Sequence, residues 1–336
     1  MRDILSEVVG KWSLIPQKRN RNGAFPGIFK YIPHSRLFCS KSRINTSWPS
    51  SLTLTLLFLK DILHWKSLAM ASPEPLQSPE GQTRLVRHFE GRSIDDHSAA
   101  WSNLWDTDNS DMWDRGKPSP ALIDALEQNQ DTFNPITADG RRKRALVPGC
   151  GKGYDVVMLA LHGFDAYGLD VSSKGVSVAE EYAGKELQSP QPYNFGAEGT
   201  ARERGNVSFI EGDFFKSKWE DGRKFDLIYD YTFLCALHPT NRREWASRMA
   251  DLLLPGGLLI CLEFPLFKDL SLPGPPWPLK GVYWNLLVEG GDGLVTKDRV
   301  ISDSVDGSFV RNLYIKPETS YENGKGTDML SVYAKK

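Results

Sequence analysis

The chain has 336 residues, of which 40% are hydrophobic and 25% are charged, and its formal net charge is −1 at pH 7. A chain of this length and composition buries a sizeable core, which excludes the disordered, collagen-like and disulfide-stapled classes. The near-neutral charge also argues against nucleic acid as the main partner, because a phosphate-binding face normally gives its domain an excess of Lys and Arg.

The first 70 residues are more basic than the rest of the chain. They contain eleven Lys or Arg against three Asp or Glu, which is typical of a mitochondrial transit peptide, and their longest apolar run, residues 52–59, is too short to span a bilayer. Alternatively, Met70 is the true start, and the scattered Pro and Gly favour this interpretation. We therefore expect residues 1–69 to be disordered or absent from the mature protein, and residues 70–336 to form a cytoplasmic domain. A mitochondrial location follows if the leader is a transit peptide.

Three tryptophans and several acids precede the first regular elements. Trp101 and Trp105 are four residues apart and would share one face of a helix, which packing alone explains. Trp113 lies in a turn-rich segment that packing explains less well. Aromatic faces suit a cation without ammonium-type donors, so we expect residues 84–120 to form an aromatic lid over a ligand. A helix over 120–128 follows, with Ser119 as its cap.

Strands and helices then alternate along the chain. Apolar strands are expected at 145–147, 166–169, 207–210, 225–229 and 258–263, and helices at 154–161, 176–187 and 241–254. This order predicts a doubly wound, mostly parallel α/β sheet. A polar loop insertion over 189–205 interrupts the alternation. A helix at 282–288 and strands at 310–315 and 329–334 complete the chain, and the last strand is expected to be antiparallel.

The turn after the first strand contains glycine at every second position: Gly149, Gly151 and Gly153. A dinucleotide fingerprint would need a further glycine where Tyr154 stands, and no Walker-type ending follows. Alternating glycines after an apolar strand are instead typical of S-adenosylmethionine enzymes. The alternative, a tight turn without a ligand, is disfavoured by the acids at the following strand ends.

Each of the next three strands is followed by an acid. Asp170 stands where doubly wound folds place an acceptor for ribose hydroxyls. Asp213 precedes Phe214, so the pair could contact and stack on adenine, and Asp230 precedes Tyr231 at the fourth strand. Any one of these acids could simply cap a turn. Their occurrence at successive strand ends instead predicts a ligand site at the carboxyl edge of the sheet.

These motifs resemble the thiopurine S-methyltransferase superfamily over roughly residues 84–336. The plant "harmless to ozone layer" thiol and halide methyltransferases and their fungal relatives are the most similar members. The matching motifs include the three tryptophans, Val147-Pro-Gly-Cys-Gly151, Asp213-Phe-Phe215 and Asp230-Tyr-Thr-Phe233. The segment between Trp105 and Trp113 is one residue longer here, and loop 189–205 is longer than in the plant proteins.

The resemblance implies a seven-stranded class I methyltransferase fold, Rossmann-like, with S-adenosyl-L-methionine as cofactor. It places the cofactor contacts on Trp101, Trp105, Trp113, Gly149, Asp170, Asp213, Phe214 and Tyr231, to which the glycine pattern adds Gly151. Asp230 and Tyr231 are the candidate catalytic residues on the acceptor side, with Tyr231 in a positioning role and Cys235 as packing.

The expected reaction is in-line methyl transfer to a small thiol, bisulfide, thiocyanate or halide, since such nucleophiles need no strong base. An O- or N-methyltransferase would need one, for which His238 is the candidate, and a non-catalytic cofactor-binding relative is a further alternative. The four Cys and six His show no metal-ligand spacing. We therefore expect no metal, and a monomer that acts on a small molecule, without nucleic-acid or membrane partners.

Overall fold

The computed structural model describes residues 83–336 except 198, 200–201, 297 and 299–305. The predicted leader, residues 1–69, lies outside the described residues. Within the described part of the chain, no helix is long and apolar enough to cross a membrane.

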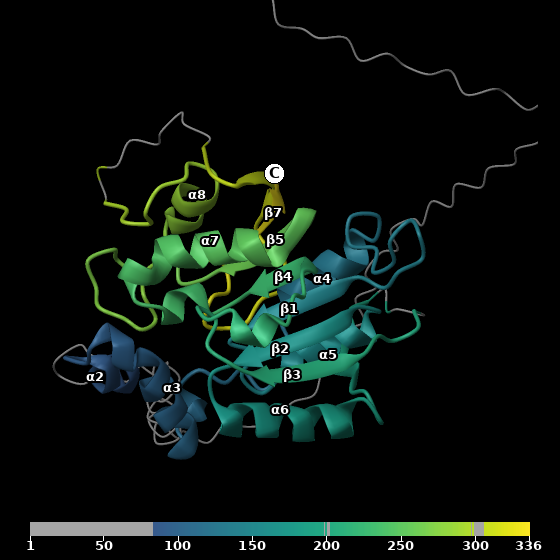
Figure 1. Ribbon diagram of the computed structural model, residues 1–336, viewed down its shortest axis with the longest axis horizontal. Helices are drawn as coiled ribbons and strands as arrows, with labels where there is room; N and C mark the ends of the chain where they lie inside the picture. Colours follow the sequence, from purple (N-terminus) through teal and green to yellow (C-terminus); the bar gives the residue numbers. More distant parts are fainter. Residues whose placement is uncertain (1–82, 198, 200–201, 297, 299–305) are drawn as a thin grey trace, which may run out of the picture. The chain divides into compact units, whose positions relative to one another are not determined.

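A single mixed sheet organises these residues, with strand order β3-β2-β1-β4-β5-β7-β6 (Figure 1). Its strands are β1 (Arg144–Pro148), β2 (Asp165–Asp170), β3 (Val207–Glu211), β4 (Phe225–Asp230), β5 (Leu253–Glu263), β6 (Phe309–Ile315) and β7 (Met329–Lys335). The first five are parallel, and β7 runs antiparallel between β5 and β6. The predicted seven-stranded α/β fold with an antiparallel last strand is confirmed, and β6, not β7, forms the edge.

Three helices connect parallel strands: α5 (Tyr154–Leu161), α6 (Ser173–Glu186) and α7 (Arg242–Leu252). Helix α4 (Pro120–Gln128) precedes β1, and α8 (Val282–Leu287) lies between β5 and β6. Helix α4 begins where expected because the Ser119 side chain accepts a hydrogen bond from the Leu122 N–H and Pro120 stands in its first turn. Helix α6 begins three residues earlier than expected, since the Ser172 side chain caps it through the Gly175 N–H.

Two short helices precede the sheet: α2 (Arg84–Phe89) and α3 (His97–Asp106). They lie off the carboxyl ends of the strands, with α3 against α6 (Figure 1). Their buried side chains form a small apolar cluster of their own, made of Leu85, Phe89, Ala100 and Leu104. The expected lid region is therefore a small packed unit above the end of the sheet where the ligand site was predicted.

Strand β5 differs most from expectation. It begins at Leu253, five residues before the predicted start, and runs through Pro255-Gly256-Gly257. Leu253 already pairs with Phe225, and the register then shifts before Leu258 pairs with Leu227. The glycines thus form an irregularity within the strand where the sequence predicted a turn before it, because a register shift accommodates the extra residues without ending the pairing.

Candidate active site

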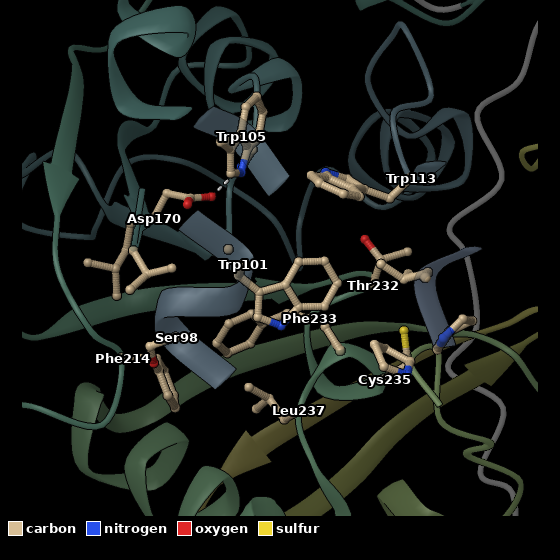
Figure 2. A pocket seen from close by; sticks show the side chains of 18 of the residues that line it. Ser98, Trp101, Trp105, Trp113, Asp170, Phe214, Thr232, Phe233, Cys235 and Leu237 are labelled. Carbon is tan, nitrogen blue, oxygen red and sulfur yellow. Dashed lines mark hydrogen bonds between the residues drawn. The ribbon is translucent and has the colours of Figure 1, made fainter. Parts of the chain in front are cut away.

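A pocket of about 260 Å³ opens at the carboxyl ends of β1, β2 and β4, beneath α3 (Figure 2). Eight of the nine predicted cofactor residues line it: Trp101, Trp105, Trp113, Gly149, Gly151, Asp170, Asp213 and Phe214. Tyr231 is not among the lining residues. We call the part formed by Gly149, Gly151, Asp170, Asp213 and Phe214 the glycine end. The part formed by Arg115, Thr232, Cys235, Phe264 and Asn323 is the arginine end.

The glycine turn forms the backbone surface of the pocket. Gly149, Gly151 and Gly153 have φ values of 59°, 54° and 78°, in the left-handed region that side chains rarely adopt. A Cβ on Gly149 would lie 2.5 Å from Cδ2 of Phe233. A Cβ on Gly151 would meet only Cζ2 of Trp105, at 3.8 Å. Gly149 is therefore required by both conformation and space, and together with Gly151 it leaves backbone open to a ligand.

Asp170 ends β2 at the pocket wall. Its Oδ2 accepts a hydrogen bond from the Gly151 N–H at 3.0 Å, and its Oδ1 accepts one from the Ser172 N–H at 3.0 Å. Burial raises the pKa of this carboxyl to about 6, and the backbone donors partly oppose that effect. Asp170 is thus ionised at neutral pH, and each oxygen keeps a further lone pair for a ligand hydroxyl.

Beside Asp170, the segment after β3 supplies a flat apolar wall. Phe214 is buried, and its ring meets Phe233 edge to face at 5.0 Å. Arg248 covers the Phe214 ring with Cζ 5.7 Å from its centroid. Asp213 accepts a hydrogen bond from the Phe215 N–H at 2.9 Å, which fixes the turn that presents both side chains. This surface fits a planar base.

The three tryptophans pack together and also line the pocket. Trp113 meets Trp101 and Trp105 edge to face, with ring centroids 5.3 and 5.7 Å apart. Trp101 and Trp113 lie over the middle of the pocket, across from Asp170 (Figure 2). Their segment is attached to the domain by an ion pair between Asp114 and Lys152.

The two predicted catalytic residues lie behind the pocket wall. Asp230 is fully buried and accepts hydrogen bonds from the Leu234 N–H, the Trp245 Nε1–H and the Tyr283 hydroxyl, at 3.3, 3.0 and 3.2 Å. Burial raises its pKa to about 6. Tyr231 stacks on Tyr321 with centroids 5.1 Å apart, and its buried hydroxyl has no hydrogen-bond partner. The structure brings neither residue into the pocket lining, and in both cases packing of the β4 end against neighbouring segments is the reason.

Residues that follow directly after Tyr231 do line the pocket. Thr232 has a φ of 58°, a conformation that β-branched residues rarely adopt. It lies opposite Asp170, next to Cys235 (Figure 2). Such strain is concentrated at functional sites. No local sequence pattern predicts that Thr232 lines the pocket, apart from its position shortly after a strand-end acid.

Other residues of the arginine end were also missed from the sequence. Arg115 follows Trp113 by two positions, a proximity that could have drawn attention to it. Phe264 and Asn323 come from segments far apart in the chain and carry no such signal. His238 does not line the pocket: its Nδ1 contacts the Thr240 hydroxyl at 2.8 Å, and burial lowers its pKa. Among the described residues, no group of His, Cys, Asp and Glu could hold a metal ion.

The glycine end fits S-adenosylmethionine. The backbone of Gly149 and Gly151 lines the pocket, the ionised Asp170 suits ribose hydroxyls, and Phe214 suits the base. These are general properties of a nucleoside-binding strand edge. They do not by themselves identify the family.

Comparison with known proteins identifies the family. The family model for thiopurine S-methyltransferase matches residues 96–291. "Probable thiol methyltransferase 2" of Arabidopsis thaliana is 39% identical over 189 residues, which cover 56% of this chain and 71% of the relative. "Thiocyanate methyltransferase 1" of the same plant is 34% identical, over 53% of this chain and 65% of the relative.

Among solved structures, magnesium protoporphyrin IX methyltransferase from Synechocystis PCC 6803 with bound SAM aligns at 17% identity and a TM-score of 0.43. The alignment covers 72% of this chain and 98% of that chain. The fold assignment depends on the strand order described above, and the family assignment on the sequence match. The chain belongs to the thiopurine S-methyltransferase family and is an S-adenosylmethionine-dependent methyltransferase.

Proposed function

We propose that this enzyme methylates a small nucleophile that is already an anion or readily becomes one: a thiol, bisulfide, thiocyanate or halide. The observation that supports this most is the composition of the arginine end. Its described lining contains no carboxylate and no imidazole that could act as a general base. The names of the relatives, a thiol and a thiocyanate methyltransferase, agree with the same acceptor class.

S-adenosylmethionine supplies an electrophilic methyl group on a positively charged sulfur. The chain's own part is to place the acceptor and to exclude water from it. Trp101, Trp105 and Trp113 cover the pocket, and at the glycine end Asp170 and the backbone at Gly149 bind the cofactor. An ionised nucleophile already has a lone pair free to form the new bond to the methyl carbon, so no proton has to be removed during the transfer.

Asp230 and Tyr231 act in this proposal as positioning residues. The Asp230 carboxylate accepts from the Leu234 N–H and thereby holds the turn that presents Thr232, Phe233 and Cys235 to the pocket. Tyr231 is fixed between Phe264 and Tyr321, with ring centroids 6.0 and 5.1 Å away. Burial raises the pKa of the Cys235 thiol, so this residue stays uncharged and does not compete as a nucleophile.

The pH dependence of the rate tests the nucleophile. With a series of thiols of different pKa, the rate should rise with pH to each thiol's own pKa and then level, because the thiolate reacts. His238→Ala should change kcat/KM by no more than about threefold, since His238 lies outside the pocket lining. Steady-state kinetics over a range of pH measures both.

An O- or N-methyltransferase that uses His238 as base would behave differently. The inflection would then belong to the enzyme and stay fixed when the thiol is exchanged, and His238→Ala would lower the rate about 100-fold or more. That combination would overturn the proposed acceptor class. Calorimetric titration with S-adenosylmethionine is the control, and it should show that His238→Ala leaves cofactor binding unchanged.

A further inference from the structure

Arg115 supplies the positive charge in the pocket lining. Among the described lining residues it is the single Lys or Arg. Its Nε is buried and has no hydrogen-bond partner, and no ion pair links the side chain to a described carboxylate. A buried guanidinium donor without an acceptor is costly, because the group loses its contacts with water and gains none in exchange. Such groups in native structures call for an explanation.

Two carboxylates lie near Arg115 without forming an ion pair with it, and one of them, Asp328, has a buried Oδ1 that has no hydrogen-bond partner. Asp114 precedes Arg115 directly, but it pairs with Lys152 and also accepts a hydrogen bond from the Gly116 N–H at 2.9 Å. Asp328 is close enough for Arg115 to lower its pKa, against a larger rise from burial. Its Oδ2 accepts from the Ser320 hydroxyl at 2.7 Å, and it forms no ion pair with Arg115. The Arg115 charge is therefore placed in the pocket without a carboxylate bound to it.

Tyr231 lies next to Arg115, behind the pocket wall. Burial raises the pKa of the Tyr231 hydroxyl, and the charge and the N–H donors of Arg115 oppose that rise. Arg115 also lies over the ring of Phe264, with Cζ 5.9 Å from the centroid. Arg115 and Tyr231 come from segments more than a hundred residues apart. They meet in an apolar, aromatic environment in which electrostatic interactions are strong.

A positive charge in the pocket lining, with a buried donor that has no hydrogen-bond partner, suits an anion. We propose that Arg115 forms an anion subsite at the arginine end and selects acceptors that carry a negative charge. This inference rests on the proposed function and narrows it to a chemical class. The Asp114–Lys152 ion pair strengthens it, because it fixes the turn that carries Arg115 and keeps Asp114 from neutralising the guanidinium.

The anion could be the reacting atom itself, as in thiocyanate, or a carboxylate elsewhere on a thiol acceptor. The shared chemistry is one negative charge facing a guanidinium, which often binds carboxylates through two parallel hydrogen bonds. Three probes separate the two sources: thiocyanate, 4-mercaptobenzoate, and the methyl ester of 4-mercaptobenzoate. The last two share a thiol on the same ring and differ in the remote charge.

Binding of each probe is measured by tryptophan fluorescence on protein saturated with S-adenosylhomocysteine, since three tryptophans line the pocket. Arg115→Gln should weaken binding of thiocyanate, of 4-mercaptobenzoate or of both about tenfold or more. The ester is charged only at its ionised thiol, so its binding should be weakened only if Arg115 faces the reacting atom. Arg115→Lys, which keeps the charge but loses the planar fork, should restore part of the loss. Arg87→Gln, which removes an exposed arginine of α2, is the matched control and should change nothing.

Weakening of thiocyanate and of the ester points to the reacting anion, and weakening of mercaptobenzoate but not its ester points to a remote carboxylate. No effect of Arg115→Gln on any probe would overturn the subsite, provided that thermal melting shows the variant folded. Methyl transfer by the wild-type protein is assayed separately with the same probes. If none is methylated while the charge selectivity of binding holds, the proposed function fails and the anion subsite stands.

Discussion

The carboxyl ends of β2 and β4 carry the same side chain in different surroundings. Asp170 and Asp230 are both buried, both accept hydrogen bonds from backbone N–H groups, and burial raises the pKa of each to about 6. Asp170 lines the pocket. Asp230 instead faces α7 and α8, from which Trp245 and Tyr283 donate to it.

The difference between these two aspartates lies in what is packed across from them. In front of β2 the chain places Gly149 and Gly151, which have no side chains and line the pocket. Behind β4 the chain places two large side chains, Trp245 and Tyr283, and both donate hydrogen bonds to the Asp230 carboxylate. A perturbed pKa therefore does not separate a binding residue from a structural one here, and the comparison between Asp170 and Asp230 can be tested directly.

The largest effect is expected for Asp230→Ala. The change leaves the Trp245 and Tyr283 donors buried and unpaired, so the free energy of unfolding should fall by about 3 kcal/mol. Urea denaturation measures it, with Asp251→Ala, an exposed aspartate of α7, as the control. Calorimetry of the folded variant should find the cofactor affinity within about threefold of wild type. Lost cofactor affinity with unchanged stability would contradict the comparison.

Asp170→Ala should have the opposite profile. Ribose hydroxyls lose an ionised acceptor, so the free energy of cofactor binding should weaken by about 1.5 to 3 kcal/mol, as measured by calorimetry. Because the pKa of Asp170 is about 6, the wild-type affinity should be constant above about pH 7 and fall as the pH decreases through that pKa.

In Asp170→Ala this acid-side decrease should be absent. Asp165→Ala is the matched control, because Asp165 stands at the other end of the same strand and accepts hydrogen bonds from Asn206. A cofactor affinity that is unchanged in Asp170→Ala would remove this residue from the site. It would also weaken the assignment of the glycine end to the cofactor.

The smallest effect is expected from Gly149→Ala compared with Gly256→Ala. Both glycines have positive φ, 59° and 73°, so the backbone conformation alone should reduce the free energy of unfolding of each alanine variant by about 1 kcal/mol, and the contact with Phe233 should add to that loss in Gly149→Ala. Only at Gly149 would the new Cβ meet a pocket residue, Phe233, whereas nothing lies within 4 Å at Gly256. Cofactor affinity should therefore fall about tenfold in Gly149→Ala alone. Equal cofactor affinities in the two variants would show that the ring of Phe233 moves aside at little cost.

The sequence alone determined the fold and the glycine end of the pocket. Strand and helix order follows from hydrophobic periodicity, and helix α4 from a cap and a proline at adjacent positions. The glycine turn follows β1 and the acid ends β2, so both belong to one strand–helix–strand unit. These features depend on neighbours in the chain, so their spacing is visible in the sequence.

The tertiary structure decided the rest of the site. The sequence placed both Asp170 and Asp230 at the ligand site, but Asp230 lies outside the pocket lining because α7 and α8 supply donors to its carboxylate. Arg115, Tyr231, Phe264 and Asn323 come together only after the sheet, the N-terminal segment and the segment before β7 have packed. Contacts between distant segments depend on the packing of the whole domain, and local sequence patterns do not predict them.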